Sequence, residues 1–323
     1  MLKNRVIRTT ITIGDENKSY LSKGERLPNG KVYMRQDFTV KSYINVGSTG
    51  LHTSEISLWN LSDKSSKEIE QKGILVTLEA GYEGKTGKIF EGKISSVTRT
   101  KSSSVKTDII TTLYCASGLN FLQNSSFSEA IVFEDLRSVL GRLADRLGLS
   151  LVIDNQVEGA ISNASLEGDI LTILKNLSTE FNFNFYWTET QLYIKAVLPI
   201  EQVPIAKKYT PENGLLDIPV VTEIGVNVKV FLDPNISPGD GFSLDSKFAN
   251  FAIGSLNFVD RIRGDQIKTF GREINNNRYQ GNYQALEILH EGSSHEDTWQ
   301  TQINAMGAYN LQNINNTERL AIT

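Results

Sequence analysis

The chain has a single cysteine among its 323 residues, which excludes an intramolecular disulfide framework and a zinc cluster built on several thiolates. Cys115 ends an alternating run, Val105–Cys115, in which every second residue can face the same side. A free cysteine in such a run is typically a buried, small apolar residue. We therefore expect Cys115 to be a structural thiol rather than a nucleophile.

Long apolar runs are also missing. No stretch approaches the roughly 18 apolar residues that a membrane-spanning helix needs. The first residues, Met1–Val6, carry charge but lack the apolar segment of a secretory signal. We expect no membrane insertion, and a protein that is made in the cytosol and stays there or is packed there into a particle.

Histidine is scarce, with only His52, His290 and His295. A triad with a histidine base therefore has few candidates, and no Gly-x-Ser-x-Gly elbow is present. The segment His290–His295 resembles a zinc-protease motif, but its histidines are five residues apart rather than four, and Gly-Ser-Ser between them disfavours a helix. We expect a turn between strands at this segment.

Two further segments resemble the start of an ion-binding or phosphate-binding loop but lack residues that these motifs require. The segment Asp233–Gly239 begins like a calcium loop, but Pro238 occupies the position that requires glycine and Leu244 the position of the bidentate glutamate. Gly47–Gly50 lacks the lysine and the following helix of a phosphate loop. The sequence therefore predicts no catalytic residue, no cofactor-binding residue and no metal ligand, and the protein is not expected to be an enzyme.

The net charge of −4 conceals an asymmetry along the chain. Residues 1–125 hold 18 lysines and arginines against 12 aspartates and glutamates, whereas the remainder holds 15 against 25. The cations of the first part are dispersed among threonines and serines, without the cluster and interleaved aromatics of a nucleic-acid interface. We interpret them as solvated strand faces and interface pairs, and we expect no stable nucleic-acid binding.

Residues 1–125 have the pattern of short β-strands. Apolar residues alternate in two segments, one with Ile7, Thr9, Ile11 and Ile13 and one with Phe38, Val40, Ile44 and Val46 on a single face. The nearly continuous apolar run Ile74–Leu78 suits a strand buried on both sides. Ser62 or Asp63 is the expected N-cap of a short helix. Many short strands with one helix favour a small closed or nearly closed barrel.

Residues 126–198 change period. Leucines and valine from Leu136 to Leu147 recur at three- and four-residue steps, which predicts an amphipathic helix that ends at Gly148. A strand over Leu149–Ile153, a second helix over Ile170–Leu177 and an aromatic hairpin from Phe181 to Ile194 follow. Alternation of Phe181, Phe183 and Phe185 with polar residues indicates core rather than a base-stacking surface. This part is predicted to be a helix–strand–helix–hairpin module.

Residues 199–323 return to strands. Four prolines between Pro199 and Pro219 predict an extended connector. Strands are expected at Val226–Phe231, Gly241–Leu244, Gln284–Leu289 and Thr298–Ala305. Residues 247–280 have the composition of an inserted loop, and the polar tail from Asn310 is expected to be mobile.

Two sets of short motifs occur in order along the chain. The first set comprises Ile56–Leu61, Ala80–Gly84 and Ile89–Ile94, and the second comprises Gly214–Leu216, Ile224–Val226, Phe231–Asp240, Gly281–Tyr283, His290–Gly292 and Trp299–Thr301. Together they resemble the two β-barrel halves of the baseplate hub proteins of long-tailed bacteriophages, which are related to the base of type VI secretion spikes. The chain departs from the family pattern in the longer segment 247–280 and near Ser293–Asp297, where the family has a Gly-Asp turn.

The resemblance, with the strand pattern, implies a mainly β fold with an α+β insert. Two tube-protein-like β-barrels, 1–125 and 199–323, would flank the α+β helix–hairpin module 126–198. The second barrel would carry the inserted loop 247–280 and the polar C-terminal tail.

In function, the resemblance implies a structural hub of a phage tail baseplate. Three copies would form a ring that adapts the six-fold tail tube to a three-fold spike and lets the genome pass. Its partners would be its own copies, the tail tube or a distal tail protein on one side, a spike or needle protein on the other, the tape-measure protein and other baseplate proteins. The protein would belong to the virion, would be assembled in the host cytoplasm and would need no cofactor.

A second hypothesis is a carbohydrate-binding or adhesin-type β protein of a tail tip, and a third is a glycan hydrolase. Carbohydrate-binding modules display exposed aromatic platforms, whereas Trp59, Trp187 and Trp299 lie in strand-like patterns that favour burial. A hydrolase would need a carboxylate pair, which cannot be selected from 37 acidic residues without geometry.

Overall fold

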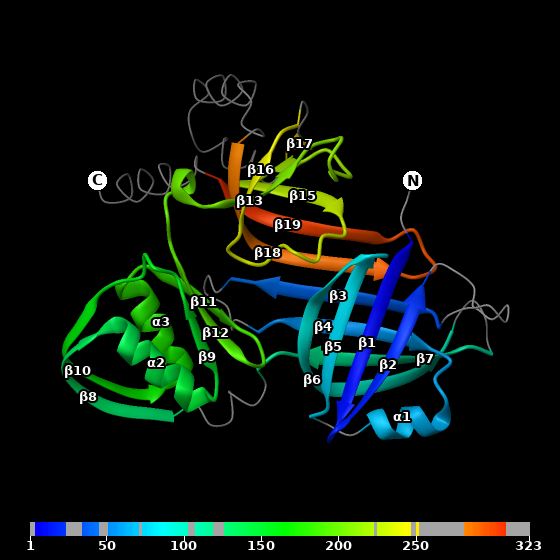
Figure 1. Ribbon diagram of the computed structural model, residues 1–323, viewed down its shortest axis with the longest axis horizontal. Coiled ribbons are helices and arrows are strands. Elements are labelled where there is room, and N and C mark those ends of the chain that lie inside the picture. Colours follow the sequence, from blue (N-terminus) through cyan, green and yellow to red (C-terminus); the bar gives the residue numbers. More distant parts are fainter. Residues whose placement is uncertain are drawn as a thin grey trace, which may run out of the picture. The chain divides into compact units, whose positions relative to one another are not determined.

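The computed structural model describes residues 4–23, 34–44, 51–70, 73–102, 107–118, 126–222, 225–246, 250–251 and 281–307. These residues are mainly in β-strands, and Figure 1 labels the elements. The chain divides into two compact units. The first unit holds Met1–Val197 and His290–Thr298, and the second holds Leu198–Leu289 and Trp299–Thr323. The chain therefore passes from one unit to the other three times.

The first unit contains an antiparallel sheet built from residues 5–116. The order across it is β3 (Gln36–Tyr43), β4 (Thr53–Trp59), β7 (Ile109–Ala116), β6 (Lys85–Lys101), β5 (Leu75–Tyr82), β1 (Arg5–Ile13) and β2 (Glu16–Lys23). The strand β18 (Gly281–Ser293) enters this unit at His290 and lies next to β3. The turn that follows β18 is thereby placed beside the beginning of β3.

Alternating residues of these strands form the core of the sheet. Ile7, Thr9 and Ile11 of β1 are completely buried, as the period of two predicts, and Phe38 and Val40 of β3 are also buried. Val46 and Val105, which belong to two of the predicted alternating strands, lie outside the described residues. The short helix α1 (Asp63–Ile69) begins at Ser62, whose hydroxyl accepts a hydrogen bond from the backbone N–H of Ser65, and this confirms the predicted N-cap.

The prediction that Ile74–Leu78 is buried on both sides is wrong. In β5, Val76 and Leu78 are buried, whereas Leu75 and Thr77 are partly exposed. The strand lies between β1 and β6 in an antiparallel sheet with one covered face. Its apolar composition therefore reflects β-propensity as well as burial.

The side chain of Gln36 joins the two ends of this sheet. It is fully buried, accepts a hydrogen bond from the Thr9 hydroxyl at 2.7 Å and donates one to the carbonyl of Tyr20 at 2.9 Å. Because Thr9 is in β1 and Tyr20 in β2, the sheet curves until β3 faces these strands. Among the described residues, however, no backbone pairing joins β2 to β3, so the sheet is open and the expected closed barrel is not formed by hydrogen-bonded strands.

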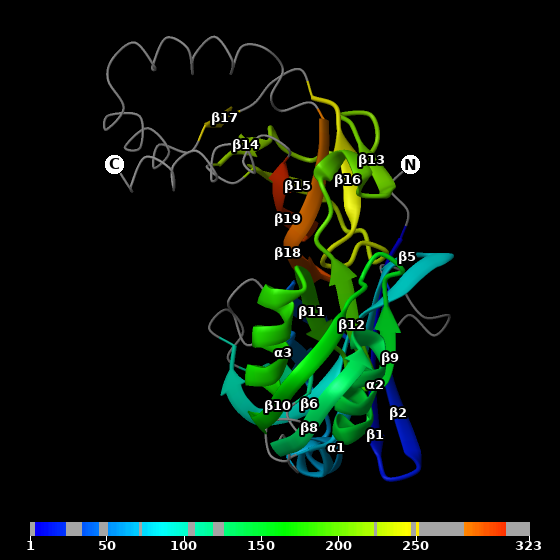
Figure 2. The same cartoon turned by 90° about the vertical axis from the view of Figure 1, so that its left-hand side faces the viewer.

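Residues 126–196 of the same unit form three layers. A two-stranded ribbon of β8 (Ser126–Asp135) and β10 (Ala160–Asp169) covers one side of the helices α2 (Leu136–Leu147) and α3 (Ile170–Glu180). A sheet of β11 (Phe183–Trp187), β12 (Gln191–Ala196) and β9 (Ser150–Ile153) covers the other side. Figure 1 shows the helices between the two sheets, and Figure 2 looks onto the ribbon.

Local signals explain the two helices. Each begins where a ribbon strand ends, with Asp135 or Asp169 accepting hydrogen bonds from N–H groups of the first turn. α2 ends at Gly148, whose φ of 73° is left-handed, as the sequence predicts. The predicted core is buried and comprises Leu136, Leu140, Leu143, Leu174, Leu177, Phe183 and Phe185. The strands β8 and β10 were not predicted.

The second unit is a smaller β-structure. β15 (Gly225–Phe231) pairs antiparallel with β19 (Trp299–Gly307), and β16 (Gly241–Leu244) pairs antiparallel with β18 and parallel with β13 (Ile205–Tyr209). The short strands β14 (Val220–Val221) and β17 (Asn250–Phe251) follow β15 in the sheet. Its core contains Val226, Val228, Val230, Phe242, Tyr283 and Ile303.

All four predicted strands of this part are confirmed, although β18 is longer than expected at both ends. The expected connector between Pro199 and Pro219 is not wholly irregular. It contains the 3₁₀ turn η1 (Ile200–Gln202) and β13, which lies between two of the prolines and pairs with β16. Of the predicted loop 247–280, only Asn250–Phe251 is described, and the predicted tail from Asn310 lies outside the described residues. Among the helices that are described, none has the length and apolarity to cross a membrane.

Candidate functional site

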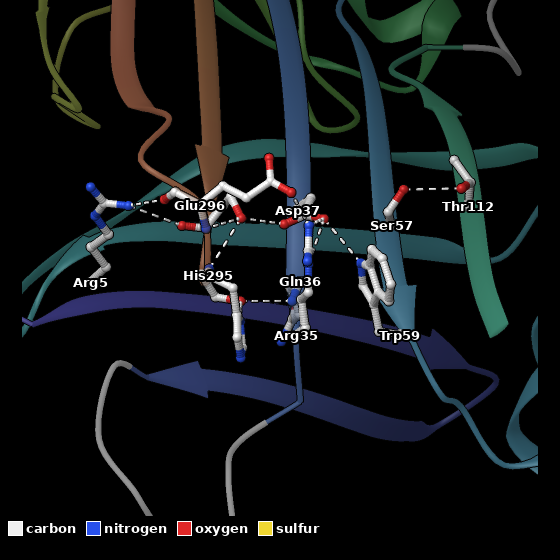
Figure 3. A network of polar contacts seen from close by, with 11 residues as sticks. Arg5, Arg35, Gln36, Asp37, Ser57, Trp59, Thr112, His295 and Glu296 are labelled. Atoms are coloured by element: carbon white, nitrogen blue, oxygen red, sulfur yellow. Dashed lines mark hydrogen bonds and ion pairs between the residues drawn. The ribbon is translucent and has the colours of Figure 1, made fainter. Parts of the chain in front are cut away.

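The turn after β18 is held by an arginine from the other end of the chain. The guanidinium of Arg5 donates hydrogen bonds to the carbonyls of Ser293 at 3.4 Å, Glu296 and Asp297 at 3.2 Å. All of these residues belong to the first unit. A planar guanidinium with several donors can bind several carbonyls at once, so Arg5 fixes the shape of the turn (Figure 3).

Asp37 of β3 is the acceptor at the centre of the same network. Its Oδ2 accepts hydrogen bonds from Arg35 Nε at 3.2 Å, Arg35 Nη2 at 3.1 Å and Trp59 Nε1 at 3.0 Å. Its Oδ1 accepts one from the Ser293 hydroxyl at 2.5 Å. The Ser293 hydroxyl in turn accepts from the N–H groups of His295 and Glu296. Both oxygens of Asp37 are therefore occupied, and the carboxylate connects β3, β4 and the turn.

Arg35 completes this polar cluster. Its guanidinium carbon lies 4.0 Å from the centre of the Trp59 ring, a cation–π distance, and it forms ion pairs with Asp37 and Glu296. Burial alone would lower the pKa of Arg35, but the hydrogen bonds to Glu296 and Asp37 outweigh it and raise the pKa above its ordinary value. We call Arg5, Arg35, Asp37, Trp59, Ser293 and Glu296 the turn clasp.

Backbone and hydroxyl contacts extend the turn clasp across the sheet. Gln36 and Ser294 exchange two hydrogen bonds of 2.9 Å, in which each backbone N–H donates to the other residue. Further along the same face, the hydroxyls of Ser57 and Thr112 lie 3.0 Å apart (Figure 3). Within the clasp, Arg35 is paired with two carboxylates and Arg5 binds backbone carbonyls, so these contacts fix the turn beside β3.

A second junction attaches the three-layer part to the large sheet of the first unit. The ring of His52 stacks on Tyr186 of β11 with centroids 5.4 Å apart, and Tyr186 stacks on Tyr193 of β12 at 4.7 Å. Tyr43 of β3 approaches His52 edge-on at 6.4 Å. Burial lowers the pKa of His52 to about 4, so the imidazole is neutral at pH 7. Its Nε2 has no hydrogen-bond partner among the described residues.

The hairpin between β11 and β12 makes a further contact at this junction. Glu189 accepts a hydrogen bond of 2.6 Å from the backbone N–H of Gly118, next to the end of β7. Lys93 Nζ lies 4.0 Å from its other oxygen. Burial raises the pKa of Glu189, although the Gly118 N–H and Lys93 act in the opposite direction. An aromatic stack and a buried carboxylate therefore anchor the three-layer part.

The residues that the sequence analysis weighed as chemical sites are dispersed. His290 is buried in β18, which continues to Ser293, while His295 is exposed in the turn that follows. The turn expected at His290–His295 therefore lies between two strands but begins only after Ser293. Cys115 is buried, as the alternating run predicts, and burial raises the pKa of its thiol to about 12. No cluster of three metal-ligating side chains occurs among the described residues, and Gly47–Gly50 lies outside them.

The turn predicted at Asp233–Gly239 is confirmed by its hydrogen bonds. Asp233 accepts from the Tyr209 hydroxyl at 3.0 Å and pairs with Lys207, so its oxygens serve the second unit itself. Burial, followed by the nearby Asp233 carboxylate, raises the pKa of Tyr209. At the far end of the turn, the backbone N–H of Ser237 donates to Asp240 at 2.8 Å.

Sequence reasoning missed the turn clasp. Arg5 and Asp297 are 292 residues apart, and Asp37 and Ser293 are 256 apart. One feature of the sequence could have pointed to this turn: residues Ser293–Asp297 depart from the family pattern. Trp59, which was expected to be buried, is only partly so, because its ring lies at the end of β4 under Arg35.

Comparison with solved structures gives relatives of similar fold at low identity. A tail protein from Neisseria meningitidis MC58 has a TM-score of 0.58 at 8% identity, covering 93% of this chain and 96% of its own. The 43 kDa tail protein of prophage MuSo2 from Shewanella oneidensis has a TM-score of 0.56 at 8% identity, with the same two coverages. The E. coli c3393 protein, a type VI secretion component described as similar in structure to the T4 bacteriophage tail proteins gp27 and gp5, has a TM-score of 0.52 at 8% identity and covers 84% of this chain and 73% of its own.

Sequence comparison with curated proteins finds no match. The family model described as Baseplate hub gp41, in contrast, matches residues 51–261. This match includes β4, β5, β6 and β7 of the large sheet, the three-layer part, and the second unit from β13 to β17. Since it spans more than half of the 323 residues, the chain belongs to the baseplate hub gp41 family, a family of structural proteins of the phage tail.

Proposed function

We propose that three copies of this chain form a ring that adapts a six-fold tail tube to a three-fold spike and lets the genome pass. The family match is the observation that carries this proposal. Two similar β-rich parts in one chain can offer six similar sites when three copies close by rotation through heterologous contacts. A ring of this kind needs no cofactor, because its function is its shape.

We also propose that each β-rich part is a tube-like barrel. The division is 1–125 for the first barrel, 126–198 for the α+β module and 199–323 for the second barrel. The strong curvature that Gln36 indicates supports the first barrel, and the common core of β15, β16, β18 and β19 supports the second. Neighbouring copies would provide the strands that complete the open sheets.

The partners follow from this position in the tail. The ring binds the tail tube or a distal tail protein on one side and a spike or needle protein on the other, with the tape-measure protein and other baseplate proteins as further neighbours. The protein is assembled in the host cytoplasm and ends in the virion. It makes no stable complex with nucleic acid and does not insert into membranes.

The test of the ring is the mass of the assembled protein. Light scattering should give about three times the chain mass of 36.0 kDa. Chemical cross-links between chains should join residues of 1–125 to residues of 205–305. The proposal would be contradicted if the purified protein stayed a monomer or dimer at high concentration and was also not trimeric in purified baseplates.

We further propose that the protein has no hydrolytic activity. The clasp carboxylates Asp37 and Glu296 are engaged by arginines, which disfavours a role as general acid or base. Purified protein should not release sugars from peptidoglycan or other glycans. Turnover that is lost on changing one carboxylate, with the fold intact, would overturn this.

The carbohydrate-binding hypothesis is less well supported. Trp187 and Trp299 are buried, and the Trp59 ring is covered on one face by Arg35. None of the three tryptophans therefore provides the open aromatic platform on which a sugar ring would stack.

A further inference from the structure

The ribbon of β8 and β10 exposes two large apolar side chains. Val132 and Phe133 are 79% and 75% exposed, whereas the next most exposed large apolar residue of the described chain, Ile218, is 44% exposed. Neighbouring strand residues normally point to opposite faces, so a strand covered on one side buries one of the two. Here neither is buried.

The exposed pair lies within a paired strand. Phe133 pairs with Ser162 and Ile131 with Ala164, so the register of β8 and β10 is the same on both sides of Val132, and Asn163 has a φ of 48°, in the left-handed region. Ile131 is buried, whereas the next two side chains of β8 are exposed. The backbone that carries the exposed pair is therefore held by its pairing with β10.

The surface around the pair is suited to contact with another chain. β8 pairs only with β10 among the described strands, so its other edge presents backbone N–H and C=O groups. The side chains that precede the pair on the open face, Ser128 and Ala130, are small and exposed. The helices occupy the opposite face (Figure 2). A strand of a partner can therefore approach the edge of β8 closely.

The charge of the ribbon limits which surface can bind to it. The ribbon strands carry Glu129, Glu134, Asp135, Glu167 and Asp169 and no lysine or arginine. Arg142 of α2 pairs with Glu129 and Glu134, which leaves an excess of negative charge. A second copy of the same face would bring like charges together, so a contact between two ribbons is disfavoured.

A complementary edge exists on the large sheet of the same unit. The pairing of β5 with β6 extends to Lys93, and residues 95–101 of β6 pair with β7 alone among the described strands. This edge exposes Arg99 and Lys101, contains no acidic residue and includes the partly exposed Val97. Asp63 pairs with Arg99, and Lys101 remains an exposed cation.

We propose that the edge of β8, with Val132 and Phe133, docks on the residue 95–101 edge of β6 in a second copy of the chain. The contact is heterologous, since the apolar edge of a net-acidic ribbon meets a basic edge, and repeated contacts of this kind close a ring. This inference rests on the proposed ring and assigns one of its interfaces. It makes the ribbon, which is part of the α+β module, a direct contact between subunits.

The first experiment removes the apolar pair. The double variant V132S/F133S should weaken trimer formation at least about tenfold in sedimentation equilibrium, because an exposed aromatic anchor at an interface is lost. Its thermal unfolding at low concentration should equal that of the wild type, since both side chains are exposed. A trimer of unchanged affinity would overturn the inference and leave the ring proposal standing, whereas a monomeric wild type would refute the ring itself.

The second experiment tests the charge at the contact. Lys101→Glu should weaken the trimer, because it places a negative charge against the net-acidic ribbon. Lys85→Glu is the matched control, because Lys85 is an exposed lysine at the opposite end of β6 and changes the net charge equally. Equal effects of K101E and K85E would contradict the docking of the ribbon on the residue 95–101 edge.

Discussion

At the level of single residues, Asp37 shows how one carboxylate can organise a region. It receives hydrogen bonds from Arg35 of its own segment, Trp59 of β4 and Ser293 of the distant turn. Charge-assisted hydrogen bonds of this kind are stronger than neutral ones, and their loss leaves the guanidinium of Arg35 with one acidic partner fewer. The stability of the clasp should therefore depend more on Asp37 than on exposed ion pairs.

Asp37→Ala should lower the free energy of unfolding by about 2 kcal/mol, and Asp37→Asn by about half of that, because the amide keeps one acceptor. Urea unfolding followed by tryptophan fluorescence measures the effect. Glu79→Ala is the control, since Glu79 pairs with the more exposed Arg8 and should cost about 0.5 kcal/mol or less. Equal losses for D37A and E79A would show that the clasp is not a stabilising network.

His52 should make the stability of the first unit depend on pH. Its pKa of about 4 in the folded protein lies below the ordinary 6.5, so the unfolded chain binds the proton first as the pH falls. Stability should be complete above pH 6.5 and should fall between pH 6.5 and 4, by up to about 3 kcal/mol.

His52→Phe keeps an aromatic ring for the stack on Tyr186 and removes the titration. Urea unfolding of both proteins at pH 7, 6 and 5 gives the difference directly. The stability of the wild type relative to H52F should decrease with each step. A constant difference over this range would mean that His52 is not the group that titrates.

At the level of elements, local signals account for what the sequence predicts well. α1, α2 and α3 were predicted because Ser62, the leucine periods and Gly148 act within a few residues. β8 and β10 were missed because their serines, glycine and asparagine have low strand propensity, and the helices that cover them supply the missing stabilisation. The turn clasp was missed because no local pattern records a contact across more than 250 residues.

Close backbone approach gives a testable feature of β15. A Cβ at Gly225 would lie 2.1 Å from the carbonyl oxygen of Ala305 in β19 and 2.9 Å from the Met306 Cα, so the strands would have to separate. Gly225→Ala should destabilise the second unit by about 2 kcal/mol or more. Hydrogen exchange of β15 and β19 measures this loss.

Gly141→Ala provides the matched control. Gly141 lies inside α2, and a Cβ there meets no atom within 4 Å. The same substitution should stabilise the helix by about 0.5–1 kcal/mol, because alanine loses less backbone entropy. If Gly225→Ala and Gly141→Ala changed stability in the same direction, the close approach of β15 and β19 would not explain the effect of Gly225→Ala.

At the level of the whole molecule, the distribution of charge bears on the passage of a genome. The pI of about 5.6 and the dispersed cations of residues 1–125 predict weak, non-specific interaction with duplex DNA. Fluorescence anisotropy with a random duplex at physiological ionic strength should show no sub-micromolar binding. A tight, salt-sensitive complex would contradict the proposed passage of DNA through a ring of these subunits.

The return of residues 290–298 to the first unit has a consequence for biosynthesis. Arg5 and Asp37 are translated more than 250 residues before their partners Glu296 and Ser293 in the turn. The sheet of the first unit must therefore wait for these residues before its contacts with the turn can form. A chain that terminates before residue 290 cannot form the clasp, so a completed turn distinguishes a finished first unit from a truncated one.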